Sequence, residues 1–318
     1  MSKKGAGSRA NPNGVNPGSG GSAGIQARAA PQAESDAFRN PCSAPSGLTP
    51  DLAAGVEAGE PAVVHEASEP APWLDQVFCE DALEGLQRIP DGSIDLILTD
   101  PPYNLGKDYG NASDQKSVDE FLAWTEQWVD AALPKLKENG SLYVFTTWRS
   151  APEIFVMLKR RMTMINEIIW DRRVPSMGGT VRSFTSVHDT VGFFVRRKDY
   201  YFDLDAVRIP YDPETKKARS RSIFVGAKGL GQGYNPKDLW SVSRLHRQHA
   251  ERVDHPTQKP LEIIERMVKA SCPPGGVVLD LFMGSGTTAV AARNTGRHFT
   301  GFELNPDYCR VLAERLAE

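Results

Sequence analysis

Short apolar runs alternate with amphipathic segments between residues 73 and 318, and this pattern predicts the elements of an α/β fold. Runs rich in aliphatic and aromatic residues predict buried strands at residues 94–98, 142–145, 167–170, 189–195, 276–282 and 298–303. Helical spacing of apolar residues predicts helices at residues 80–86, 152–161, 260–270, 287–294 and 306–318. Strand, helix and strand in this order favour a parallel sheet.

One further helix has a clear start after the strand at 94–98. Ser117 and Glu120 have the spacing of a capping box. Apolar residues then recur on one helical face, at Phe121, Trp124, Trp128 and Ala132. Pro134 predicts a kink or an early end, whereas Asn139-Gly140 is the cleaner stop signal.

Two segments lack this regularity. Residues 1–72 are dominated by Gly, Ala, Ser, Pro and Asn, a composition that buries too little apolar surface to offset the entropy of ordering, so they predict a disordered N-terminal tail. Residues 73–318 predict the folded domain. Within it, the stretch from about 172 to 252 is mostly loop-like, apart from the strand at 189–195.

The composition indicates the class of protein, and the distribution of charge indicates the kind of ligand. The chain has 318 residues, of which 40% are hydrophobic and 24% charged, as in soluble globular proteins, and it has no apolar run approaching ~18 residues that would span a membrane. The net charge is −3. Residues 172–252 carry 16 Lys and Arg against 8 Asp and Glu, whereas the remainder carries 21 against 32. This asymmetry favours one segment facing a polyanion, with a solvated charged face as the alternative.

The four cysteines lie far apart and include no C-x-x-C spacing. That spacing argues against a zinc site or a disulfide framework and favours a reducing cytoplasm. We therefore expect a cytoplasmic protein without a metal. His255 is the one histidine that invites a ligand role, but no cysteine or second histidine stands at ligand spacing, so a structural role is favoured.

The first candidate site follows the strand at residues 94–98. Thr99-Asp100-Pro101-Pro102-Tyr103 comes directly after it, and the two prolines must end the strand because neither can donate a ladder hydrogen bond. A carboxylate and an aromatic ring therefore lie at the carboxyl end of a strand, where open α/β sheets bind ligands. The alternative is an ordinary proline turn with an incidental tyrosine.

A second candidate site lies near the C-terminus. The strand at 276–282 leads through Gly284-Ser285-Gly286 into a helix, and such a loop lets the backbone approach a ligand beside free N–H groups. Gly284-x-Gly286-x-x-Ala289 also fits a relaxed dinucleotide fingerprint, so NAD is a competing cofactor. Glu303 ends the next strand, where a carboxylate can bind ribose hydroxyls of any nucleoside cofactor. A tight turn beside a buried glutamate is the structural alternative.

The two motifs occur together with His255-Pro256-Thr257-Gln258-Lys259-Pro260 and with the basic segment between them. This combination resembles the DNA amino methyltransferases that use S-adenosylmethionine, in the beta-type order with the catalytic motif before the target recognition region and the cofactor motif after it. The resemblance implies a Rossmann-like methyltransferase fold of α/β class. Its central sheet would be mostly parallel, and a loop-rich target recognition region would be inserted at about residues 172–252.

Site residues follow from that resemblance. It implies a catalytic segment of Asp100, Pro101, Pro102 and Tyr103, in which Asp100 and the Pro101 carbonyl accept hydrogen bonds from the target amine while Tyr103 stacks on the base. It implies cofactor contacts by Asp81, Asp100, Thr257, Gln258, Lys259, Asp280, Phe282, Gly284, Ser285, Gly286, Thr287 and Glu303. Within that set, Glu303 would hold the ribose, Asp81 or Ala82 the adenine edge, and residues 257–259 the cofactor carboxylate. Helix N-caps remain the alternative for Asp81 and Thr257.

The predicted function is methyl transfer from S-adenosylmethionine to the exocyclic N6 of adenine in duplex DNA, with the base flipped out of the helix. The same chemistry on N4 of cytosine is the alternative, and an inactive DNA-binding module is a second one. Double-stranded DNA is the expected partner, without a membrane, and the resemblance leaves open a homodimer and a cognate restriction endonuclease. The pool for DNA contact is Arg172, Arg173, Arg182, Arg196, Arg197, Lys216, Lys217, Arg219, Arg221, Arg244 and Arg247.

Overall fold

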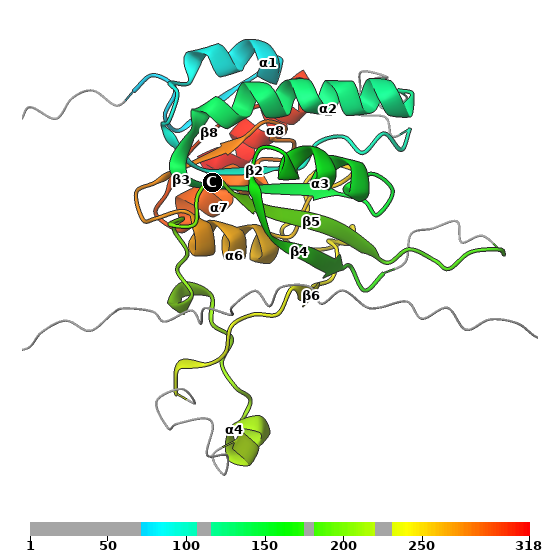
Figure 1. Ribbon diagram of the computed structural model, residues 1–318, viewed down its shortest axis with the longest axis vertical. Coiled ribbons are helices and arrows are strands. Elements are labelled where there is room, and N and C mark those ends of the chain that lie inside the picture. The colour runs from blue at the N-terminus through cyan, green and yellow to red at the C-terminus, as the bar shows by residue number, and fades with distance from the viewer. Residues whose placement is uncertain (1–70, 107–115, 175–180, 220–230) are drawn as a thin grey trace, which may run out of the picture. The chain divides into compact units, whose positions relative to one another are not determined.

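The computed structural model describes residues 71–106, 116–174, 181–219 and 231–318. Its centre is an eight-stranded sheet in the order β1-β8-β7-β2-β3-β5-β4-β6 (Figure 1). The strands are β1 (Gln76–Phe78), β2 (Ile94–Thr99), β3 (Leu136–Thr146), β4 (Thr163–Asp171), β5 (His188–Val195), β6 (Leu239–Ser241), β7 (Val277–Asp280) and β8 (His298–Phe302). All neighbouring pairs are parallel except β3 with β5 and β5 with β4, so the expected mostly parallel α/β sheet is confirmed.

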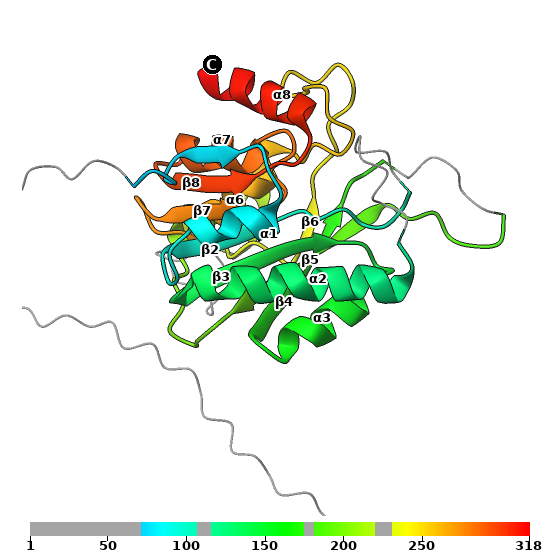
Figure 2. The same ribbon diagram turned by 90° about the horizontal axis from the view of Figure 1, so that it is seen from above.

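Helices cover both faces of this sheet (Figures 1 and 2). On one face, α1 (Ala82–Gly85), α2 (Val118–Ala132) and α3 (Ala151–Lys159) contribute apolar residues to one core cluster. On the other face, α6 (Leu261–Ser271), α7 (Thr287–Asn294) and α8 (Pro306–Ala317) contribute to a second cluster. The remaining described helix, α4 (Pro213–Arg219), buries none of its residues.

Strand β2 separates these two cores. Every one of its residues is buried, and the alternation of strand side chains sends Ile97 into the first cluster while Leu96 and Leu98 enter the second. Burial on both faces explains why the sequence reads as a continuous apolar run. Its parallel neighbours β3 and β7 fix the level at which β2 ends, with Thr99 level with Val144.

The structure corrects one predicted boundary and adds elements that the pattern missed. Asn139-Gly140 was expected to stop a helix, but α2 ends at Ala132, a 3₁₀ turn with Pro134 in its first residues follows, and β3 already begins at Leu136. The earlier proline therefore ended the helix, as its missing N–H requires. Strands β1 and β6 and helix α4 were not predicted, because three-residue strands and a helix without buried residues carry no hydrophobic period.

The cysteine prediction was wrong in one respect. Cys79, just after β1, forms a disulfide with Cys309 on α8, although 230 residues separate them. Spacing along the sequence could not reveal this pair, because β1 joins the sheet next to β8 and so comes close to the helix that follows β8. Cys272 is a buried free thiol, and burial raises its pKa to about 12. Cys42 lies outside the described residues, as does the predicted tail up to residue 70.

Within the described part of the chain, no helix is both long enough and apolar enough to cross a membrane.

Candidate active site

Asp100 and Tyr103 lie together where β2 ends. The Tyr103 hydroxyl donates a hydrogen bond of 2.5 Å to Asp100 Oδ1. Tyr103 is buried in the second core cluster, which fixes the position of its ring, and Pro101 is buried beside it. The two prolines restrict the backbone of residues 100–103, and Tyr103 is fixed by the burial of its ring and by its hydrogen bond to Asp100. We call residues 100–103 the platform, and we infer that it is rigid.

Lys259 completes this platform. Its Nζ forms an ion pair with Asp100 Oδ2, and the lysine side chain is only 8% exposed. The ammonium also lies 5.4 Å from the ring centroid of Tyr103 and 5.1 Å from that of Phe145. The resemblance implied that Lys259 reaches the cofactor carboxylate, whereas here its cation is directed at the carboxylate of Asp100.

The glycine loop between β7 and α7 has the backbone that its sequence requires. Gly284 and Gly286 have φ angles of 52° and 76°, in the left-handed region that side chains other than glycine disfavour. A Cβ on Gly284 would lie 2.9 Å from His255 Nε2, and one on Gly286 would lie 2.7 Å from Leu312 Cγ. The loop is thus packed closely on two sides, and α7 begins directly after Gly286.

Glu303 links this loop to the end of β8. Its two carboxylate oxygens accept hydrogen bonds from the backbone N–H of Gly284 at 2.7 Å and of Asn305 at 2.8 Å. Burial raises the pKa of Glu303, and the two backbone donors oppose that rise. Each oxygen keeps acceptor capacity, so the carboxylate can also bind the two hydroxyls of a ribose.

Asp280 is buried beneath the loop at the end of β7. Its carboxyl accepts hydrogen bonds from Thr288 Oγ1 at 2.6 Å, from the Phe282 N–H at 3.1 Å and from Thr99 Oγ1 at 3.2 Å. Burial raises its pKa to about 7 despite these donors. Asp280 therefore ties β2, β7 and α7 together below the candidate site, in addition to lining the cavity above.

Gln258 and Thr257 have positions that the sequence left open. The Gln258 amide binds the loop before it, accepting from the Val253 N–H at 2.9 Å and donating to the Glu251 carbonyl at 2.6 Å. Thr257 does not cap α6, whose first residue is Leu261 and whose N-cap position is Pro260, so the N-cap alternative for Thr257 was wrong. For Asp81 that alternative is confirmed, since its carboxylate accepts from the Leu83 N–H at 2.8 Å and caps α1.

These residues enclose a cavity of about 300 Å³ between the glycine loop, α1 and α2. All but one of the residues expected to contact the cofactor line this cavity. The exception is Gly286, which is the N-cap of α7. The lining residues of that set are Asp81, Asp100, Thr257, Gln258, Lys259, Asp280, Phe282, Gly284, Ser285, Thr287 and Glu303. Trp124 and Trp128 of α2 form an apolar wall and contact the Phe282 ring at 5.5 and 5.8 Å between centroids. A cavity with apolar walls and a carboxylate whose oxygens can accept from ribose hydroxyls suits a nucleoside cofactor.

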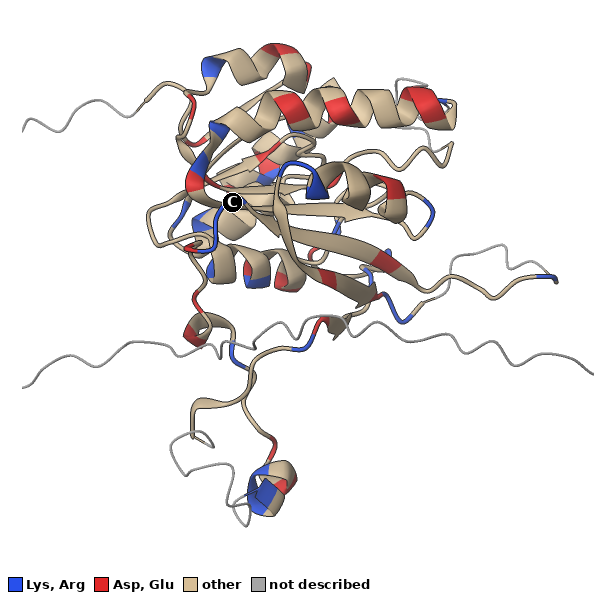
Figure 3. Cartoon of the chain, viewed as in Figure 1, with Lys and Arg blue, Asp and Glu red and all other residues tan. Residues whose placement is uncertain are grey.

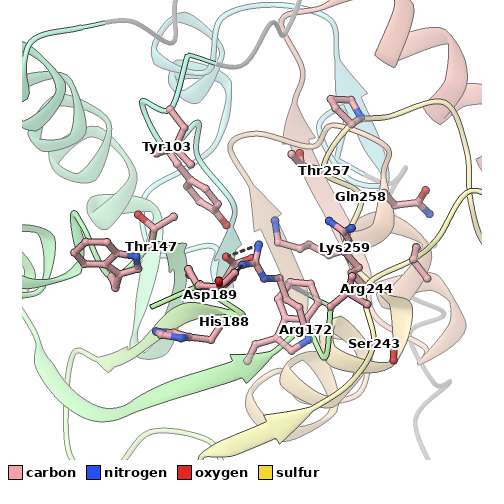
Figure 4. Close-up of a pocket in the computed structure, with 18 of the residues that line it drawn as sticks. Tyr103, Thr147, Arg172, His188, Asp189, Ser243, Arg244, Thr257, Gln258 and Lys259 are labelled. Carbon is pink, nitrogen blue, oxygen red and sulfur yellow. Dashed lines mark hydrogen bonds and ion pairs between the residues drawn. The ribbon is translucent and has the colours of Figure 1, made fainter. Parts of the chain in front are cut away.

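A larger cleft of about 1320 Å³ lies on the other side of the platform. Tyr103, Lys259 and the ion pair of Arg172 with Asp189, at 3.4 Å, face this space (Figure 4). Thr257, Gln258 and Lys259 line both the cleft and the smaller cavity. The two spaces therefore meet at the platform, with Asp100 lining one and Tyr103 the other.

The cleft is strongly basic. Its lining includes one acidic residue, Asp189, and six basic ones, namely Arg149, Arg172, Arg244, Arg247, Arg252 and Lys259. Three of these, Arg172, Arg244 and Arg247, belong to the predicted pool for DNA contact. Such a concentration of positive charge is the electrostatic footprint of a polyanion site.

Other members of the predicted pool lie elsewhere. Arg196 donates to the Leu136 carbonyl at 2.6 Å and so braces the start of β3. Arg219 stacks over Tyr211 in the arm that carries α4, whose surface is mostly basic (Figure 3). Arg221 lies outside the described residues.

Sequence reasoning missed three kinds of site residue. It did not foresee the ion pair of Lys259 with Asp100, the Trp124 wall of the cavity, or the Trp148-Arg149 pair at the cleft. The last pair carried a usable signal, because residues just after β3 lie at the same sheet edge as Asp100. The ion pair and the Trp124 wall depend on contacts between segments that are far apart in the sequence, and no local sequence pattern reveals such contacts.

Among the described residues, no group of three or more His, Cys, Asp or Glu is arranged to hold a metal ion. His255 instead packs edge-on against the Tyr308 ring, with 4.5 Å between centroids, and its Nδ1 accepts from the Thr257 N–H at 3.3 Å. It lies under Gly284, so its position is explained by support of the glycine loop.

Comparison with known proteins agrees with this geometry. The model of a family described as DNA methylase, covering N6 and N4 methyltransferases, matches residues 94–315. The chain is 35% identical to the Type II methyltransferase M.HpaI of Haemophilus parainfluenzae, over 76% of this chain and 74% of that protein. It is 36% identical to the Type II methyltransferase M1.MboII of Moraxella bovis, over 74% and 92%. It is 33% identical to the DNA adenine methyltransferase YhdJ of Escherichia coli, over 74% and 80%.

Solved structures share the fold. The PvuII DNA methyltransferase, which is cytosine-N4-specific, superposes with a TM-score of 0.59 at 21% identity, covering 76% of this chain and 86% of that one. The M1.HpyAVI complex with SAM superposes with a TM-score of 0.53 at 24% identity, covering 76% and 99%.

Proposed function

Because the chain belongs to the DNA methylase family of N6 and N4 methyltransferases, we propose that it transfers a methyl group from S-adenosylmethionine to the exocyclic N6 of adenine in duplex DNA. One observation carries the proposal: a cavity suited to a nucleoside cofactor and a basic cleft suited to DNA meet at Asp100, Tyr103 and Lys259. A donor in one space and an acceptor in the other would face each other across this platform.

The residues present fit the cofactor. Glu303 would accept hydrogen bonds from the ribose hydroxyls, and the glycine loop would let the backbone approach the amino-acid end. The apolar wall of Trp124 and Trp128 would hold the adenine ring. When bound, S-adenosylmethionine supplies an electrophilic methyl group on its sulfonium.

On the acceptor side, Asp100 and the Pro101 carbonyl would accept hydrogen bonds from the two hydrogens of the target amine. Those hydrogen bonds would draw the nitrogen toward tetrahedral geometry and expose its lone pair, which is otherwise delocalised into the ring. Lys259 now occupies Asp100 Oδ2, so the amine must replace the ammonium there. Asp100 need not be a strong base, because the proton can leave after the nitrogen has attacked.

The target must leave the duplex to reach this platform, since Tyr103 is buried at the inner end of the cleft. The five arginines of the cleft would hold the DNA backbone on either side. A homodimer, a cognate restriction endonuclease and a cytoplasmic location remain predictions that belong with this proposal.

Asp100→Ala tests the platform. We expect the variant to lose methyl transfer to DNA while it keeps most of its affinity for S-adenosylmethionine, because Asp100 would bind the amine where the two spaces meet, whereas Glu303 would hold the ribose. Incorporation of labelled methyl groups and calorimetric binding of the cofactor would measure the two effects. An equal loss of cofactor binding would show that Asp100 serves the cofactor instead.

The target base is tested by mass analysis of nucleosides from DNA treated with the wild-type enzyme. We expect N6-methyladenine, as the Asp-Pro-Pro-Tyr motif and the similarity to an adenine methyltransferase support. Methyl label on cytosine N4 would overturn the choice of base and keep the mechanism. No label on any DNA would support the inactive DNA-binding module.

A further inference from the structure

Trp148 differs from the other tryptophans of this chain, all six of which lie in described residues. It is 54% exposed. The others are buried or partly buried: Trp73, Trp124, Trp128, Trp170 and Trp240. An exposed indole that lines a cleft is a frequent mark of a binding surface, because water solvates the ring poorly and a flat partner covers it well.

The turn that carries Trp148 places it beside the catalytic segment. It connects β3 to α3, and the Thr147 carbonyl fixes it by accepting from the N–H groups of Ser150 at 3.1 Å and Ala151 at 2.9 Å. Strand β3 pairs in parallel with β2, Val144 being level with Thr99, so the turn leaves the sheet at the edge where Asp100 lies. Thr147 borders the cleft on the side away from Thr257 (Figure 4).

The surroundings of Trp148 match nucleic acid. The Arg149 guanidinium lies 5.4 Å from the centroid of the indole, and both residues line the basic cleft. A cation beside an exposed ring combines phosphate contact with base stacking, which is how proteins hold unpaired nucleic acid.

We propose that Trp148 is a positioning residue that stacks on the bases bordering the gap left when the target base leaves the duplex. This inference rests on the proposed function. Flipping a base loses pairing and stacking, and an aromatic or apolar side chain that enters the stack compensates part of that loss. Trp148 acts on the DNA that stays behind, whereas Tyr103 and Asp100 act on the base that has left.

The test uses a duplex with 2-aminopurine at the target position of the recognition site, which is first identified by sequencing methylated DNA from an expressing host. The fluorescence of 2-aminopurine rises when the base unstacks. We expect the wild-type enzyme to give a large rise and Trp148→Ala a small one, with kcat/KM on the natural duplex lowered about tenfold, or about 1.4 kcal/mol. Trp148→Phe should keep most of both.

A second duplex makes the result specific. With an abasic site opposite the target, the base is unpaired before it flips, so flipping loses less pairing energy and needs less compensation by Trp148. On this duplex Trp148→Ala should approach the wild-type fluorescence and rate. If the variant stays equally impaired on this duplex, Trp148 contacts the flipped base or supports the fold, and the proposal is overturned. Wild-type behaviour of Trp148→Ala on both duplexes would overturn it as well.

Two matched variants complete the design. Arg149→Ala should weaken binding to both duplexes alike and flatten the salt dependence, because a phosphate contact does not depend on base pairing. Val156→Ala removes an apolar side chain of similar exposure, 53%, on the neighbouring helix α3 and should change neither readout. Methyl transfer by the wild-type enzyme is measured alongside, so failure of the proposed function would be seen separately.

Discussion

Two carboxylates of the site have opposite electrostatic surroundings although both follow the ends of neighbouring strands. Asp100 has the Lys259 ammonium and the Tyr103 hydroxyl against its two oxygens. Asp280 has only neutral donors, and burial raises its pKa to about 7. The oxygens of Asp100 are thus paired with an ammonium and a hydroxyl, whereas Asp280 is suited to a structural role that tolerates a proton.

That contrast gives a pH prediction for Asp280. Its pKa rises from the ordinary 3.8 to about 7 on folding, so its contribution to stability is fully present below pH 3.8 and is lost as pH rises through about 7. Asp280→Asn cannot ionise and should lack this loss. We therefore expect the free energy of unfolding of the variant to increase relative to that of wild type between pH 5 and pH 8.

Urea unfolding of both proteins without cofactor at several pH values would measure this difference. Glu303, whose pKa burial also raises, remains in both proteins and contributes the same slope to each, so it serves as an internal control. Parallel pH profiles of the two proteins would contradict the assignment.

Among the elements, α2 connects local sequence signals to the cofactor cavity. Its start is fixed by a capping box, in which Ser117 Oγ accepts from the Glu120 N–H at 3.3 Å while Glu120 accepts from the Ser117 N–H at 2.9 Å. Two turns later the helix presents Trp124 and Trp128 to the cavity. The cap therefore anchors the start of the helix that carries these two rings.

Ser117→Ala should lower the free energy of unfolding by about 1 kcal/mol, the usual cost of losing an N-cap side chain. It should also weaken cofactor binding slightly, because the first turns of α2 fray toward Trp124. Val118→Ala is the matched control, since Val118 begins the same helix with 66% of its surface exposed. Urea unfolding and cofactor titration measure both effects, and equal stability of the two variants would refute the role of the cap.

At the scale of helices and strands, the sequence predicts those features that depend on neighbouring residues alone. The apolar run of β2, the capping box at Ser117 and the glycines at 284 and 286 each dictate their own conformation, and all were predicted. The end of α2 was misplaced because two stop signals competed, and Pro134 acted before Asn139-Gly140. Strand β5 was recognisable, but its antiparallel pairing with β3 was not, since strand direction depends on the long connections around it.

At the scale of the molecule, the site is assembled from segments that the chain keeps far apart. Asp100 and Lys259 meet across 159 residues, and Thr99 and Asp280 across 181. From the sequence, the two motifs could be assigned to one site only because their order matches that of a known family. It could not predict which oxygen of Asp100 the lysine would bind, because that depends on packing of the 251–260 loop.

Every element of the candidate site lies within residues 71–318, and the family model matches residues 94–315. Removal of residues 1–70 should therefore leave methyl transfer and cofactor affinity near those of the full chain. Labelled methyl incorporation by the two proteins at equal concentration measures this. A large drop would assign residues 1–70 a part in DNA binding or in assembly of the domain.

The disulfide of Cys79 with Cys309 joins the first strand of the described domain to its last helix and closes a loop across 230 residues. In the chain-entropy account such a cross-link restricts the unfolded ensemble and contributes up to about 5 kcal/mol. We expect the double variant Cys79→Ser with Cys309→Ser to unfold at a lower urea concentration than the oxidised wild type. Dithiothreitol should shift the wild type to the midpoint of the variant and leave the variant unchanged. If the reductant shifts both proteins equally, or neither, the bond does not form in solution, and β1 is then held to β8 by its ladder and by noncovalent side-chain contacts such as Phe78 with Phe302.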